Sequence, residues 1–80
     1  MARDYYEEAR EIAVRLEQDG LKTEAKFLVD AIEGGATATE ILMALRWHLE
    51  RIEGSNPATS LETRRRIRDL SKALNTALGR

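Results

Sequence analysis

Hydrophobic residues recur with the spacing of an α-helix in four segments of the chain. These segments cover approximately 3–20, 21–33, 37–53 and 59–78. In each one, the large aliphatic side chains return every three or four residues, which places them on one face of a helix. No segment alternates apolar and polar residues as a half-buried strand does. The pattern therefore predicts an all-α protein, folded as a compact bundle of four helices.

Capping motifs and glycines indicate where these helices begin and end. The T-x-x-E pattern of a capping box opens the third segment at Thr37 and the fourth at Thr59. Gly20 and Gly54 stand where the first and third helices should stop, since glycine readily adopts the left-handed conformation that ends helices. The turn at Gly20 is short, so the first two helices should form an antiparallel hairpin. The segment from Gly54 to Pro57 should form the one longer loop.

The third helix is apolar around most of its circumference, so we expect it to be buried on more than one side and to be central. A helical wheel gives it a wide apolar arc: Ile41, Ala44, Leu45, His48, Leu49 and Ile52. Arg46, Glu50 and Glu53 form a narrow polar strip beside this arc. Met43 and Trp47 lie beyond the strip, on a second apolar flank.

The 80 residues correspond to a single small domain, 1–80. A chain of this length buries a limited fraction of its surface, so its core needs nearly every large apolar side chain. Ten residues are expected to be buried together: Ile12, Leu16, Leu28, Ile32, Leu45, Leu49, Ile52, Ile67, Leu70 and Leu74. The absence of cysteine means that neither a disulfide nor a thiolate zinc site adds stability.

The flank formed by Met43 and Trp47 has two explanations. The two residues lie one helical turn apart and therefore meet on the helix surface, with Arg51 adjacent. Either the first or the fourth helix covers them, or they bind a partner, since tryptophan, methionine and arginine are enriched in interface cores. Met43, Trp47 and Arg51 are the candidate partner-binding residues, and Phe27 likewise lies off the main stripe of the second helix. A homodimer is one form of this hypothesis, because small domains often gain stability by oligomerising.

A basic stripe on the fourth helix suggests a different partner. Its members fall within about 100° of one another on a helical wheel: Arg64, Arg65, Arg68 and Lys72. Arginine matches the geometry of phosphate, so nucleic-acid binding is the alternative hypothesis. Against it, the net charge is −1, no aromatic residue stands among the arginines, and no helix pair has the polar recognition helix of a helix-turn-helix.

The charge of the chain is unevenly distributed. Residues 1–40 carry five basic and ten acidic side chains, whereas residues 41–80 carry eight basic and four acidic ones. The two halves can attract each other within one fold. An acidic protein partner, or the acidic first helix, could therefore neutralise the basic stripe as well as a nucleic acid could.

The sequence contains no motif typical of an enzyme, a cofactor site or a metal site. His48 is the only histidine, and a general base needs a nucleophile within hydrogen-bond reach, which the sequence does not suggest. We expect it to be a buried or boundary imidazole bonded to a carbonyl or a carboxylate. The apolar runs are too short to cross a bilayer, and the N-terminus becomes acidic at once, which argues against a signal peptide. We therefore expect a cytoplasmic, non-enzymatic protein-interaction or regulatory module without a cofactor.

Overall fold

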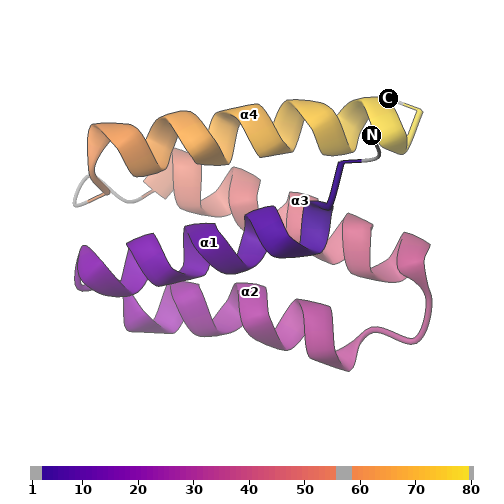
Figure 1. Ribbon diagram of the computed structural model, residues 1–80, viewed down its shortest axis with the longest axis horizontal. Helices are drawn as coiled ribbons and strands as arrows, with labels where there is room; N and C mark the ends of the chain where they lie inside the picture. The colour runs from indigo at the N-terminus through magenta and orange to yellow at the C-terminus, as the bar shows by residue number, and fades with distance from the viewer. Residues whose placement is uncertain (1–2, 56–58, 80) are drawn as a thin grey trace.

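Four helices form the computed structural model, which describes residues 3–55 and 59–79 (Figure 1). They are α1 (Tyr5–Gln18), α2 (Lys22–Gly34), α3 (Ala38–Ser55) and α4 (Leu61–Ala77). Each helix runs antiparallel to the next one and packs against it, and α4 also packs against α1. The predicted four-helix bundle is confirmed, with helices slightly shorter than expected at most of their ends.

The first two helices form the predicted hairpin. Asp4 caps α1, because its carboxylate accepts a hydrogen bond of 3.0 Å from the backbone N–H of Glu7. Gly20 has a φ of +85°, the left-handed conformation expected after a helix end. The N–H of Leu21 then donates to the carbonyl of Leu16 at 2.8 Å, which closes the turn into α2.

The start of α4 differs from the prediction. Ser60, and not Thr59, caps this helix: its hydroxyl oxygen accepts a hydrogen bond of 3.3 Å from the N–H of Thr63. The backbone N–H of Ser60 itself donates to the Asp19 carboxylate at 3.0 Å. A contact from the end of α1 therefore fixes the residue that caps α4, whereas Thr59 is buried.

The predicted end of α3 is also wrong. Gly54 does not stop the helix, which continues through Ser55, and Gly54 is not among the glycines with positive φ. The capping box at the start of α3 is present, since the N–H of Glu40 donates to the Thr37 hydroxyl at 3.1 Å. The rest of the predicted loop, 56–57, lies outside the described residues.

The core contains the predicted aliphatic residues. Nine of the ten are buried, and Ile32 is partly buried at the edge of the core. Three alanines are also buried: Ala9 and Ala13 of α1 and Ala25 of α2. In the part of the chain that the structure describes, no helix has the combination of length and hydrophobicity needed to cross a membrane.

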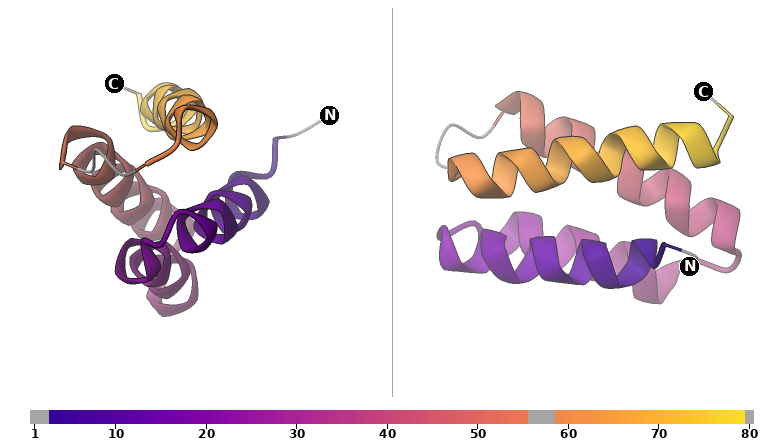
Figure 2. Two further views of the ribbon diagram at one scale, coloured as in Figure 1. Left: turned by 90° about the vertical axis from the view of Figure 1, so that its left-hand side faces the viewer. Right: turned by 45° about the horizontal axis from the view of Figure 1, so that its top comes forward.

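The position of α3 determines which of its side chains remain outside the core. It packs against both α2 and α4, as its wide apolar arc predicts, and every other helix also has two neighbours. Figure 2 shows α3 passing obliquely from the side of α2 to the side of α4. Two members of its polar strip face α4: Arg46 donates to the Asn75 side chain at 3.3 Å, and Glu53 lies 3.8 Å from Arg68.

Candidate functional site

The flank of α3 that carries Met43 and Trp47 is open to solvent. Trp47 is 54% exposed and Met43 is 45% exposed. The packing of α3 against α2 and α4 therefore leaves both side chains largely uncovered. Large apolar side chains are costly to leave in water, and a protein of 80 residues has few of them to spare.

Ring contacts hold this exposed tryptophan in place. The His48 ring stacks on Phe27 of α2, with centroids 5.3 Å apart and planes 15° apart. Trp47 meets the same imidazole edge to face at 4.9 Å, and the Arg51 guanidinium lies 4.7 Å from the centre of the Trp47 ring. These aromatic and cation–π contacts restrict the indole. We call Phe27, Met43, Trp47, His48 and Arg51 the aromatic surface.

His48 therefore has a different environment from the expected one. In the described residues its contacts are with the two rings, and no carbonyl or carboxylate bonds to it. Burial between the rings lowers the pKa of His48 from its ordinary value of 6.5, and the positive charge of Arg51 lowers it further. A lowered pKa favours the neutral imidazole, which suits its place in an apolar stack.

The lowered pKa of His48 predicts a loss of stability in mild acid. The unfolded chain binds this proton more readily than the folded one, so the free energy of unfolding should fall as the pH drops from 6.5 towards the lowered pKa. An NMR titration of the imidazole should give a midpoint below 6.5, and His48→Gln should remove this part of the pH dependence. In the control Arg51→Gln, the midpoint should rise without reaching 6.5, because burial is the larger cause. A wild-type midpoint at or above 6.5 would contradict the structure.

A hollow of about 420 Å³ adjoins the aromatic surface between α2 and α3. Its lining residues are Phe27, Asp30, Ala31, Gly34, Gly35, Glu40, Ala44 and His48. Small side chains leave this space open. The two acidic residues give the hollow a negative rim, although Lys26 pairs with Asp30 at 3.1 Å. An apolar group that carries a positive charge would fit here best.

The basic stripe is only partly available to a ligand. Arg65, Arg68 and Lys72 are exposed, while Arg64 is partly buried. Arg68 lies 3.8 Å from Glu53 of α3, so an acidic residue of the protein already accompanies one member of the stripe. Arg65 and Lys72 form no ion pair within the described residues. The ion pair between α4 and α1 involves an arginine outside the basic stripe: Arg66 lies 3.9 Å from Glu11.

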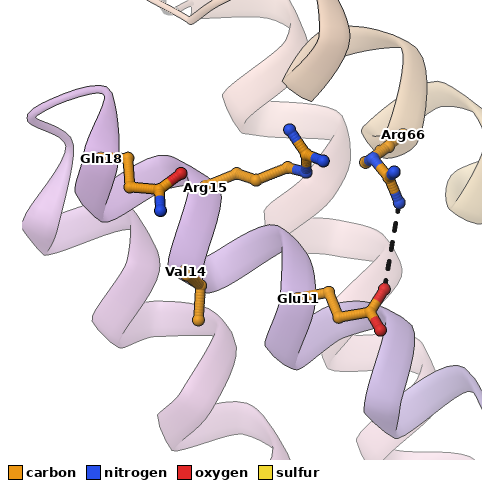
Figure 3. A pocket seen from close by; sticks show the side chains of 5 residues that line it. All are labelled: Glu11, Val14, Arg15, Gln18 and Arg66. Atoms are coloured by element: carbon orange, nitrogen blue, oxygen red, sulfur yellow. Dashed lines mark ion pairs between the residues drawn. The ribbon is translucent and has the colours of Figure 1, made fainter.

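A second hollow, of about 450 Å³, lies beside α1 and α4 (Figure 3). Its lining residues are Glu11, Val14, Arg15, Gln18 and Arg66. The Arg15 side chain extends towards Arg66, and Arg66 turns towards Glu11. The single carboxylate is thus accompanied by cations, and the set offers no pairing of a nucleophile with a base. Across residues 3–55 and 59–79, no three or more histidine, aspartate or glutamate side chains are grouped to hold a metal ion.

The structure brings the three predicted partner-binding residues together and extends the set. Met43, Trp47 and Arg51 were visible in the sequence because they share one helix. Phe27 and His48 were not assigned to the surface, since their contact depends on how α2 packs against α3. The position of Phe27 off the apolar stripe was the one available signal. Comparisons with models of protein families, with curated proteins and with solved structures gave no match.

Proposed function

We propose that this chain is a non-enzymatic protein-interaction or regulatory module of the cytoplasm, and that it binds a protein through the aromatic surface. The observation that carries this proposal is Trp47, which is 54% exposed and yet held by contacts with His48 and Arg51. A side chain that is already ordered loses little conformational entropy when a partner covers it. Tryptophan and arginine are also the residues that most often dominate binding energy.

Nucleic-acid binding through the basic stripe is the alternative. Arg65 and Lys72 favour it, since both are exposed and form no ion pair within the described residues. The acidic companion of Arg68 and the lack of an aromatic residue on this face weigh against it. The aromatic surface has the residues of a protein interface and the basic stripe has only charge, so we favour a protein partner.

Affinity capture from the native cell tests the two proposals together. The protein serves as bait with and without nuclease treatment, beside Trp47→Ala and a variant with Arg64, Arg65, Arg68 and Lys72 replaced by glutamine. We expect a protein partner that resists nuclease and is lost with Trp47→Ala. Val14→Ala is the matched control, because Val14 is 53% exposed on α1 and should leave capture unchanged. Capture that requires nucleic acid and disappears with the glutamine variant would overturn the proposal in favour of the alternative.

A further inference from the structure

A knob and a hollow of complementary character lie side by side on the outer face of the α2–α3 pair. The knob is Trp47 with Arg51 above its ring, so it is apolar and positively charged. The hollow is lined by Phe27, Ala44 and the acidic residue Glu40. Two such features on one face are what a two-fold interface needs, because each copy then offers both halves of the contact.

The spacing along α3 fits a two-fold arrangement. Glu40, Ala44, Trp47 and Arg51 fall within about 60° of one another on a helical wheel. When two copies of a helix cross antiparallel about an axis between positions 45 and 46, Glu40 of one copy faces Arg51 of the other. The same register places Trp47 opposite Ala44. A large residue therefore meets a small one, and an acid meets a base.

We propose that a second copy of this chain is the partner, paired through α3 so that Trp47 of each copy enters the hollow of the other. This inference rests on the proposed function, since it names the occupant of the same aromatic surface. Charge complementarity supports it: the acidic rim receives the guanidinium that accompanies each indole. The net charge of −1 adds little repulsion between copies.

The opposite charges of Glu40 and Arg51 allow a charge-reversal test that is specific for pairing between two copies. Glu40 and Arg51 are three turns apart, about 16 Å along the helix, so they cannot pair within one chain. Glu40→Arg places like charges at both ends of the interface, and Arg51→Glu does the same with the opposite sign. When the two variants are mixed, each acid again faces a base at both ends.

Sedimentation equilibrium from micromolar to millimolar protein measures this prediction. Wild-type protein should form a concentration-dependent dimer, and each single variant should raise the dissociation constant at least about tenfold. An equimolar mixture of Glu40→Arg and Arg51→Glu should dimerise again within about threefold of wild type. Glu17→Arg is the matched control, because it makes the same change at an exposed position of α1 and should have no effect.

Circular dichroism verifies that each variant keeps its helices. Because Glu40 also accepts a hydrogen bond of 3.4 Å from the N–H of Ala36, Glu40→Gln serves as a milder second variant, with an expected loss of about threefold. A wild-type chain that stays monomeric at every concentration would overturn the self-pairing and leave the proposed protein interaction to the capture experiment. A dimer that ignores the single variants, or a mixture that stays monomeric, would overturn this geometry.

Discussion

Replacing Leu45 by alanine is expected to destabilise the fold by about 2–5 kcal/mol, the usual cost of truncating a buried leucine. Leu45 has no exposed surface and lies in the middle of α3, between α2 and α4. The substitution removes apolar contacts and leaves a cavity that the surrounding helices fill only in part. Domains this small are stable by a few kcal/mol, so the loss is a large fraction of the total.

Urea denaturation followed by circular dichroism measures this loss, at a concentration where the protein is monomeric. Leu61→Ala is a matched control, because it makes the same chemical change at a leucine that is 75% exposed at the start of α4. We expect a change below about 0.5 kcal/mol for Leu61→Ala. Equal losses in the two variants would mean that Leu45 does not lie in the core.

Trp47→Ala, in contrast to Leu45→Ala, is expected to affect association more than the stability of the monomer. We expect it to weaken association by at least about 2 kcal/mol, which corresponds to about thirtyfold in the dissociation constant. The free energy of unfolding of the dilute monomer should change by less than about 1 kcal/mol, because more than half of this side chain is already in water. An interface residue and a core residue thus differ in which of the two measurements they alter.

The control for Trp47→Ala is Val14→Ala, which removes an equally exposed apolar group from α1, beside the second hollow between α1 and α4. Sedimentation equilibrium should give unchanged association for this control. A loss of 3 kcal/mol or more in monomer stability for Trp47→Ala, of the order seen for buried aromatic truncations, would identify Trp47 as a structural residue. Such a result, combined with unchanged association, would remove the main support for the aromatic surface.

The sequence by itself determined the helices and the core. Periodicity of 3.6 residues is a local property, and it places side chains such as Leu16 and Leu70 on one face whatever the helix packs against. The same reasoning grouped Met43, Trp47 and Arg51, because a single helix sets their spacing. The cap that Thr37 forms with Glu40 was equally predictable, because it joins neighbouring residues.

Only the tertiary structure decided which residue caps α4 and which face of α3 is left uncovered. Ser60 caps α4 because its N–H binds Asp19, which is far away in the sequence. Phe27 joins the aromatic surface through His48, a contact that exists only when α2 lies against α3. Trp47 remains exposed because the packing of α3 against α2 and α4 leaves its flank uncovered. Periodicity shows which faces of a helix are apolar, whereas packing determines which of those faces are buried.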